Sequence, residues 1–318
     1  MNEFELIHRY FNNSNQDSSV IHGIGDDAAI IKPSKNYDLV MSVDTLLEDV
    51  HFPSTMPPQD IGYRCVAVNI SDMAAMGAIP RWLTLALSLP EFNEKWLERF
   101  SIGLFTALEE YKVTLVGGDT TSGKQLTLTA SITGEVKSDS AITRAGASVG
   151  DLIFITGTIG DAAAGLGLIG DTEDSSEDEK FLIERFARPS ARSHIGQALV
   201  NIASAAIDVS DGLFADTKKL LDASLVGGSI NINDIPFSRS LINLFSQKER
   251  QQYALNGGDD YELLFTVPAT KIHELDKIKN TAGISITQIG AVSEADGLEC
   301  ILDNKKIEYD HGGYLHFS

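Results

Sequence analysis

The chain is poor in basic residues and in long apolar runs, and each shortage excludes a class of protein. It has 25 Lys and Arg against 45 Asp and Glu, which gives a formal net charge of −20 at pH 7. Such a charge repels nucleic-acid backbones and anionic membrane surfaces, so we expect no nucleic-acid partner and no membrane partner. No run approaches the roughly 18 apolar residues of a membrane span. The first residues, Met1 to Glu5, are acidic where a secretory signal is basic, and the sequence therefore predicts a cytoplasmic protein.

Cysteine is also scarce, and histidine lacks metal-binding spacing. The two cysteines, Cys65 and Cys300, are too few and too far apart for a disulfide framework or a CxxC metal site. We expect each to be a small buried residue in a reducing compartment. The seven histidines do not follow the HxxxH or HExxH spacing of zinc sites. Hard cations bound by carboxylates remain open.

The length and apolar content predict a two-domain α+β or mixed α/β protein. The chain has 318 residues, 43% of them hydrophobic, which is enough for two cores. Apolar spacing predicts helices over residues 4–11, 60–76 and 93–111, with Asn93 as an N-cap. Strands are expected over 28–31, 39–43, 82–89, 126–136, 152–155, 205–209, 230–232, 261–267 and 284–292. We place the domains at residues 1–145 and 146–318, on either side of a turn-rich junction.

Three familiar motifs occur in the wrong context. Residues 118–125 nearly match a P-loop, but Gln125 replaces the Ser or Thr that holds magnesium, and a strand rather than a helix follows. Residues 165–170 match GxGxxG inside an expected helix, where their amides would not meet a pyrophosphate. Residues 146–150 match GxSxG but precede a strand, whereas a nucleophile elbow follows one. We therefore expect Ser148 to be a turn residue.

Aspartates beside glycine or at the ends of expected strands recur at six places along the chain. A single Asp-Gly pair is most simply a turn or a cap. Six together indicate a site where the carboxylates repel one another and need multivalent cations to neutralise them. Magnesium suits such a site because it binds carboxylate and phosphate oxygens. A structural calcium loop is the rival, but its acids fall within about a dozen residues, whereas these span the chain. The places are Asp26-Asp27, Asp44, Asp72, Asp119, Asp208 to Asp211 and Asp259-Asp260.

Arg144 is the basic residue that this acidic background singles out. It lies in a Thr-Arg-Ala-Gly turn, where its guanidinium offers bidentate contacts to a phosphate. A lone surface arginine is the alternative.

The motifs that carry these aspartates, taken in order, resemble the thiamine-monophosphate kinase family. That family belongs to the superfamily that also contains aminoimidazole ribonucleotide synthetase and selenophosphate synthetase. The resemblance covers nearly the whole chain, and the combination is far more specific than any one piece. The matching segments are residues 23–29, 68–78, 117–121, 207–213 and 257–263.

The resemblance implies a two-domain fold of the aminoimidazole ribonucleotide synthetase-like type and an ATP-dependent kinase. It implies phosphorylation of thiamine monophosphate to thiamine diphosphate, several Mg²⁺ ions at the phosphates, and a homodimer. Domain 1–145 would carry the metal and ATP-phosphate motifs and the dimer interface, and domain 146–318 would complete the active-site cleft.

The resemblance also implies roles for individual residues, carried over by motif position. The implied metal ligands are Asp27, Ser42, Asp44, Asp72, Asp119, Asp208 and Asp211. The implied ATP contacts are Gly118, Asp119, Arg144 and Ser210, and the implied substrate contacts are His51, Asp259 and Tyr314. Asp72, Asp119 and Arg144 are the residues expected to support catalysis.

Two positions depart from the family pattern. Val43 stands where relatives commonly have a threonine that adds a metal contact, and Asp259 replaces a glutamate, which shortens the side chain by one methylene. A capped loop histidine and ordinary C-terminal packing are the alternatives for His51 and Tyr314. Selenophosphate synthetase is disfavoured because the first 30 residues contain neither Cys nor Lys. The hydrogenase-maturation relatives end in cysteine and this sequence ends in Ser318, so that activity is disfavoured as well.

Two alternatives to the kinase stay open. One is another ATP-dependent enzyme of the superfamily, similar to aminoimidazole ribonucleotide synthetase. The other is a regulatory protein that binds ATP and magnesium without catalysis.

Overall fold

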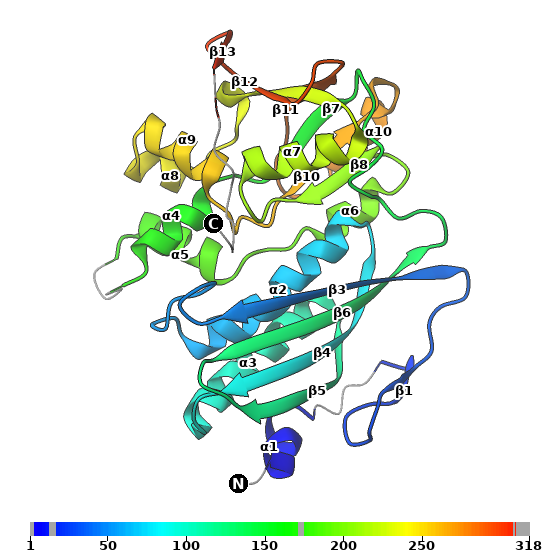
Figure 1. Ribbon diagram of the computed structural model, residues 1–318, viewed down its shortest axis with the longest axis vertical. Coiled ribbons are helices and arrows are strands. Elements are labelled where there is room, and N and C mark those ends of the chain that lie inside the picture. The colour runs from blue at the N-terminus through cyan, green and yellow to red at the C-terminus, as the bar shows by residue number, and fades with distance from the viewer. Residues whose placement is uncertain (1–2, 13–16, 171–174, 308, 310–318) are drawn as a thin grey trace. The chain divides into compact units, whose positions relative to one another are not determined.

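The computed structural model describes residues 3–12, 17–170, 175–307 and 309 (Figure 1). The chain divides into two compact units, one formed by residues 1–73 and 78–139 and the other by residues 74–77 and 140–318. Each unit has its own sheet, which agrees with the expected mixed fold of helices and strands. None of the helices in the described ranges is long and apolar enough to cross a membrane.

The first unit is built on a four-stranded sheet in the order β3-β6-β4-β5. Its strands are β3 (Tyr37–Leu47), β4 (Ile79–Leu89), β5 (Thr114–Ser122) and β6 (Thr127–Lys137). β6 pairs antiparallel with β3 and β4, and β5 joins β4 in parallel. β3 is therefore an edge strand, and its side chains alternate between an exposed and a more buried face, as a sheet covered on one side requires.

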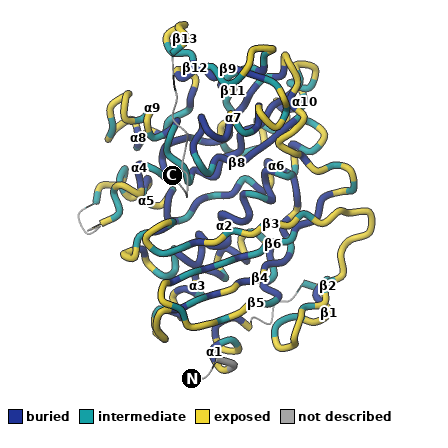
Figure 2. Tube along the Cα trace, in the orientation of Figure 1, coloured by how far each residue is buried: buried dark blue, intermediate teal, exposed yellow. Residues whose placement is uncertain are grey.

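Two long helices, α2 (Pro58–Ala75) and α3 (Glu94–Tyr111), lie on one face of this sheet (Figure 1). α2 is mostly buried (Figure 2), and Cys65 and Met73 are almost inaccessible, as their helical spacing predicts. The Asn93 side chain caps α3 by accepting a hydrogen bond from the Trp96 amide at 3.1 Å. The remaining elements are α1 (Glu3–Tyr10) and a two-stranded sheet of β1 (Val20–His22) and β2 (Ile30–Ile31).

The second unit contains a seven-stranded sheet in the order β13-β12-β9-β11-β7-β10-β8. The strands are β7 (Leu152–Thr156), β8 (Ala205–Asp208), β9 (Gly227–Asn231), β10 (Leu263–Val267), β11 (Ile286–Ser293), β12 (Leu298–Leu302) and β13 (Lys305–Ile307). Its helices are α4 (Asp161–Leu168), α5 (Glu177–Ala187), α6 (Ser193–Leu199), α7 (Leu213–Ser224), α8 (Arg239–Leu244), α9 (Gln247–Asn256) and α10 (Ile272–Lys279), with 3₁₀ turns η1 (Ile232–Asp234) and η2 (Ala269–Lys271).

Both faces of this second sheet are buried, which explains the continuous apolar runs of its central strands. Along β7, Ile153 and Ile155 belong to a core shared with α7, whereas Phe154 between them belongs to a core shared with α6 and α10. β10 alternates in the same way.

Most sequence expectations for these elements are confirmed, with small shifts in their bounds. Cys65 and Cys300 are both buried thiols. The GxGxxG segment lies mostly in α4, and the Ser148 amide closes a turn on Asp151 at 3.0 Å. The expected strand over 39–43 is longer, because its ladder with β6 continues to Leu47.

Candidate active site

A cavity of about 620 Å³ lies in the first unit and brings together two of the expected ligand segments. The loop between β1 and β2 lines one side with residues 23–29, and β5 lines another with residues 115–120. Ile7 and Phe11, from and just after α1, add apolar surface. The cavity therefore combines glycine-rich backbone, the Asp27 and Asp119 positions and an apolar wall, which suits a ligand with a polar and an apolar end.

The loop that carries Asp27 is anchored to the sheet on both sides. Before it, Val20 packs with Trp82 and Val116, and the Trp82 indole N–H donates to the Ser19 hydroxyl at 3.0 Å. After it, Glu135 accepts hydrogen bonds from the amide and hydroxyl of Ser34 at 2.5 and 2.9 Å. These contacts fix both ends of an otherwise exposed loop over the cavity.

Gly118 must be a glycine because β5 approaches its neighbour closely at this point. A Cβ at Gly118 would lie 2.0 Å from the Leu85 carbonyl oxygen. The bare backbone is therefore part of the cavity wall, and Asp119 beside it is exposed. The segment that nearly matches a P-loop is thus mostly strand.

Ser42, Asp44 and Asp72 form a second group in the same unit. Alternate residues of β3 place Ser42 and Asp44 on one face, and the Ser42 hydroxyl donates to Asp72 on α2 at 2.5 Å. Burial and the nearby Asp72 carboxylate raise the pKa of Asp44 to about 6. Burial and the Asp44 charge raise the pKa of the Cys65 thiol to about 12, so this cysteine is not a nucleophile.

The sheet register separates this group from the cavity group. Across the four strands, Asp44 lies in register with Ala130, Leu85 and Gly118. Asp119 is one residue further along β5 and lies in register with Thr45 of β3. Two strands lie between β3 and β5, which corresponds to about 14 Å at the usual strand spacing. Within one copy of this unit, Asp44 and Asp119 therefore do not coordinate the same metal ion.

The second unit brings Asp208, Ser210, Asp211 and Asp259 into two adjoining loops. Asp208 ends β8, and the chain continues through Ser210 and Asp211 into α7. The Asp259 amide donates to the Ser210 carbonyl at 3.0 Å, and the Tyr261 amide donates to the Val209 carbonyl at 2.9 Å. The two loops are therefore joined backbone to backbone.

Asp216 and Lys219, both on α7, support the first of these loops. Asp216 is 1% exposed and accepts hydrogen bonds from the amides of Ser210 and Asp211 at 3.0 and 2.9 Å. The Lys219 ammonium contacts Asp216 at 2.7 Å and also the Asp211 carboxylate. The Lys219 ammonium is therefore bound to the carboxylate of Asp211, which is an expected metal ligand.

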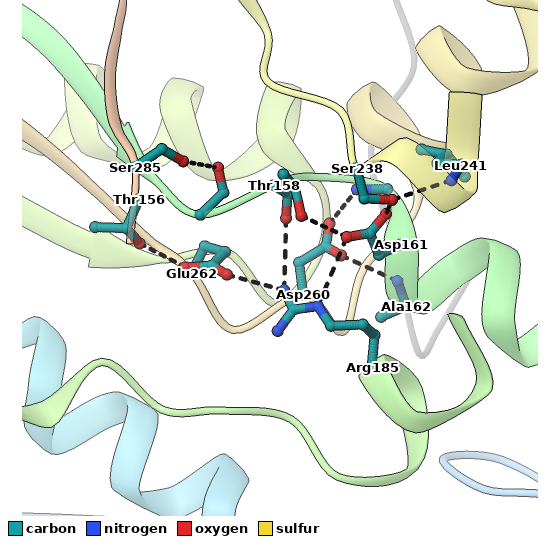
Figure 3. Close-up of polar contacts among 12 residues, drawn as sticks. Thr156, Thr158, Asp161, Ala162, Arg185, Ser238, Leu241, Asp260, Glu262 and Ser285 are labelled. Atoms are coloured by element: carbon teal, nitrogen blue, oxygen red, sulfur yellow. Dashed lines mark hydrogen bonds and ion pairs between the residues drawn. The ribbon is translucent and has the colours of Figure 1, made fainter. Parts of the chain in front are cut away.

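A buried polar network supports the second loop (Figure 3). Asp260 is fully buried and accepts hydrogen bonds from the amides of Gly160 and Ala162 at 2.7 and 3.1 Å, which caps α4. Burial, opposed by the Arg185 charge, raises the pKa of Asp260 to about 8. Asp161, nearby, accepts a hydrogen bond from the Thr158 hydroxyl at 2.5 Å.

Glu262 continues this network. It is fully buried and accepts hydrogen bonds from Arg185 at 2.8 Å, from Arg192 at 2.6 Å and from the Thr156 hydroxyl at 2.6 Å. Two guanidinium groups on one carboxylate satisfy a charge that would otherwise be very costly to bury.

The three remaining expected site residues have different surroundings. Arg144 is exposed, in a turn held by Ser224, whose hydroxyl donates to the Arg144 carbonyl at 2.9 Å and accepts from two amides beyond it. The His51 Nδ1 accepts a hydrogen bond from the Leu47 amide at 3.0 Å, so its neutral form carries the proton on Nε2. Tyr314 lies outside the described residues.

The donor set suits a hard cation such as magnesium. Within the ranges that the structure describes, no three His, Cys, Asp or Glu side chains are placed to hold a metal ion by themselves. Magnesium commonly takes one or two carboxylates and completes its shell with water and phosphate oxygens, so a site without an all-protein cage fits it. The pKa of Asp44 is raised by burial and by the Asp72 carboxylate, so a cation bound there would favour its ionised form.

Sequence reasoning missed the residues that support the loops. Asp216 and Lys219 are an i,i+3 pair on α7, a signal that the sequence contains. Arg185 and Arg192 lie 77 and 70 residues from their partner Glu262, and no local pattern links them.

Comparisons with known proteins give one consistent family. Residues 25–136 match the model of the AIR synthase related protein N-terminal domain, and residues 148–303 match that of the C-terminal domain. The chain is 44% identical over 319 residues to a thiamine-monophosphate kinase of Buchnera aphidicola subsp. Acyrthosiphon pisum, covering 99% of this chain and 98% of the relative.

Solved structures agree with this result. The thiamine-monophosphate kinase of Stenotrophomonas maltophilia superposes with a TM-score of 0.88 at 38% identity, over 96% of this chain and 98% of that one. AaThiL complexed with AMPPCP and TMP superposes with a TM-score of 0.78 at 33% identity, over 99% of this chain and 96% of that one.

The raised pKa of Asp44 makes a prediction about stability without metal. Well below pH 4 the Asp44 carboxyl is protonated in both the folded and the unfolded protein. Between pH 4 and about 6 it ionises in the unfolded protein but stays largely protonated in the folded one. The free energy of unfolding therefore falls as the pH rises through this range. In EDTA, Asp44→Asn should therefore be more stable than the parent protein by about 1 to 3 kcal/mol at pH 8, with little of this gain at pH 4. Urea unfolding at both pH values measures it, and an equal gain at both would contradict the assignment.

Proposed function

The chain belongs to the thiamine-monophosphate kinase family, and from that membership we propose that it uses ATP to phosphorylate thiamine monophosphate to thiamine diphosphate. The observation that carries the proposal is the first-unit cavity, where the loop of Asp27 meets the glycine-rich strand of Asp119 against an apolar wall. The solved structure of AaThiL, a relative with this fold, is a complex with AMPPCP and TMP.

We assign the polar end of the cavity to the ATP phosphates. Gly118 is exposed and lines the cavity, so its backbone is available to a ligand. The apolar wall of Ile7, Phe11 and Leu115 offers a surface for the base. Arg144 and Ser210, in the second unit, are proposed to contact ATP as well.

Magnesium is the proposed cofactor, several ions to a site. The residues proposed to hold it are Asp27, Ser42, Asp44, Asp72, Asp119, Asp208 and Asp211. When bound, magnesium would neutralise the negative charge of the phosphates. The separation of Asp44 from Asp119 across the sheet supports more than one ion, because a single octahedral ion does not span that distance.

We propose direct transfer of the phosphoryl group. An oxygen of the thiamine monophosphate phosphate forms a bond to the γ-phosphorus of ATP as the bond from that phosphorus to the β–γ bridging oxygen breaks, and ADP leaves. The acceptor is already ionised, so it needs little help from a base. Phosphoryl transfer depends on positioning and charge neutralisation, which Arg144 and the carboxylate-bound cations would supply. His51 and Asp259 are proposed to position the thiamine substrate, with Tyr314 as a third contact outside the described residues.

We also propose a homodimer formed through β3. This edge strand exposes a row of apolar side chains on the face away from α2, with Leu39, Met41 and Val43 exposed by 45, 69 and 60%. A long exposed apolar edge strand is a template for pairing with another strand. Because the same strand in a second copy presents the same row, a symmetric contact satisfies both copies.

The release of ADP distinguishes the candidate functions. The kinase should release ADP rapidly only when thiamine monophosphate is present, whereas an enzyme similar to aminoimidazole ribonucleotide synthetase would not respond to it. A regulatory protein would bind ATP without turnover.

Asp72→Asn and Asp119→Asn should each lower kcat by at least about 100-fold while leaving the fold intact, because they remove charge and keep shape. Near-normal turnover of both variants at saturating Mg²⁺ would reject the site.

Direct transfer predicts the stereochemistry at phosphorus. With a γ-phosphoryl group made chiral by oxygen isotopes, one in-line step inverts the configuration, whereas transfer through a phosphoenzyme restores it. We expect inversion in the thiamine diphosphate product, analysed by ³¹P NMR. Retention would refute direct transfer.

The dimer proposal predicts that charge on β3 separates the copies. Leu39→Glu combined with Met41→Glu should yield a monomer in sedimentation velocity, because each dimer would otherwise bury four added carboxylates. Ile102→Glu, at a residue 60% exposed on α3, is the matched control and should leave the assembly unchanged. An unchanged sedimentation coefficient in the double variant would exclude this interface.

A further inference from the structure

Lys219 occupies an unusual position for a lysine beside a ligand-binding loop. Its ammonium contacts two carboxylates, that of Asp211 in the loop and that of Asp216 one helical turn before it. The Lys219 side chain is 41% exposed and that of Asp211 33% exposed, whereas that of Asp216 is only 1% exposed. Lys219 therefore has one buried partner, Asp216, and one partner that solvent can reach, Asp211.

The loop does not need Lys219 to keep its backbone conformation. The amides of Ser210 and Asp211 donate to the second oxygen of Asp216, and Gly212 begins α7 immediately afterwards. Asp216 binds Lys219 through its other oxygen. The contact between Lys219 and Asp211 is thus an addition to a loop that is already held.

The neighbouring lysine provides a comparison within the same helix. Lys218 pairs with Asp222 at 2.6 Å, and both side chains are more than half exposed, by 54 and 55%. Such an i,i+4 surface pair contributes little and is strongly screened. Lys219 differs because its partners include a buried acid and an expected metal ligand.

The charges around Lys219 leave room for an exchange. Asp211 and Asp216 carry two negative charges against one ammonium, so the cluster stays negative while Lys219 is in place. The Lys219 ammonium donates hydrogen bonds to both Asp211 and Asp216. Because a lysine ammonium has three donors on a flexible stem, it can leave Asp211 and keep Asp216.

We propose that Lys219 is a resident cation of the loop that occupies the Asp211 carboxylate in the metal-free protein and yields it to a divalent cation. After the exchange the ammonium stays on Asp216. Lys219 is then a positioning residue that sets how much Mg²⁺ is needed to load this carboxylate. The inference rests on the proposed function, and specifically on Asp211 as a metal ligand.

Direct measurement of divalent-cation binding tests the proposal without any activity assay. Mn²⁺ serves as the probe, because the signal of the free ion in electron paramagnetic resonance counts bound ions on the full chain without nucleotide. Lys219→Gln should bind Mn²⁺ at one site about three to ten times more tightly than the parent protein, since a competing positive charge is gone. Lys219→Arg, which keeps the charge, should retain the parent affinity. Lys218→Gln is the matched control and should change the affinity by less than about twofold.

An Asp211→Asn background separates this inference from the proposed function. If Asp211 is a metal ligand, Asp211→Asn loses that site, and adding Lys219→Gln to it restores no affinity. If Asp211→Asn loses the site but Lys219→Gln alone binds Mn²⁺ no more tightly than the parent, the resident-cation role is wrong and the ligand assignment stands. If Asp211→Asn keeps every Mn²⁺ site at parent affinity, the ligand assignment itself is wrong and the inference fails with it.

A second readout covers a loss of stability in the variant. Thermal unfolding with and without Mn²⁺ gives the stabilisation that the ion adds to each protein. Lys219→Gln should gain more from a fixed Mn²⁺ concentration than the parent and Lys218→Gln do, whatever its melting temperature without the ion. An equal or smaller gain would overturn the proposal.

Discussion

Carboxylates that are gathered together repel one another, and the local structure depends on how that repulsion is contained. In the first unit the Ser42 hydroxyl donates a hydrogen bond to Asp72. Burial and the Asp72 carboxylate raise the pKa of Asp44. In the second unit backbone amides and Lys219 satisfy Asp216. The protein thus balances part of this charge itself, and the proposed magnesium ions would balance the rest.

The acidic residues of this chain fall into two populations with different physical roles. Asp27 and Asp119 are exposed beside the cavity, where water or a cation solvates them. Asp216, Asp260 and Glu262 are buried to within 1% exposure, and each has amides or basic side chains as partners. The buried group shapes the loops and the exposed group is available to ligands. A net charge of −20 alone does not distinguish these populations.

Local patterns predicted the elements well, because helical periodicity and strand alternation are local properties. The helix over residues 60–76 and the Asn93 cap follow directly from side-chain spacing and capping chemistry. The position of Asp44 inside β3 was less accessible, since the ladder with β6 extends the strand past its apolar stretch. The network of Glu262 was not accessible at all, because partners 70 or more residues away come together only through sheet topology.

The shortened side chain at Asp259 shows how this packing restricts the ligand loops. Its backbone has a φ of +70°, in the left-handed region, and its amide bonds to the Ser210 carbonyl at 3.0 Å. A Cβ at Gly258 would lie 2.1 Å from that same carbonyl, so the loop is already as close to its neighbour as a chain allows. Asp260 next to it is fixed by two amides, that of Gly160 just before α4 and that of Ala162 in its first turn. The loop therefore has little freedom to advance by the length of one methylene. For the contact proposed above, the substrate would therefore have to approach Asp259 more closely than it would a glutamate, or be bridged to it by water.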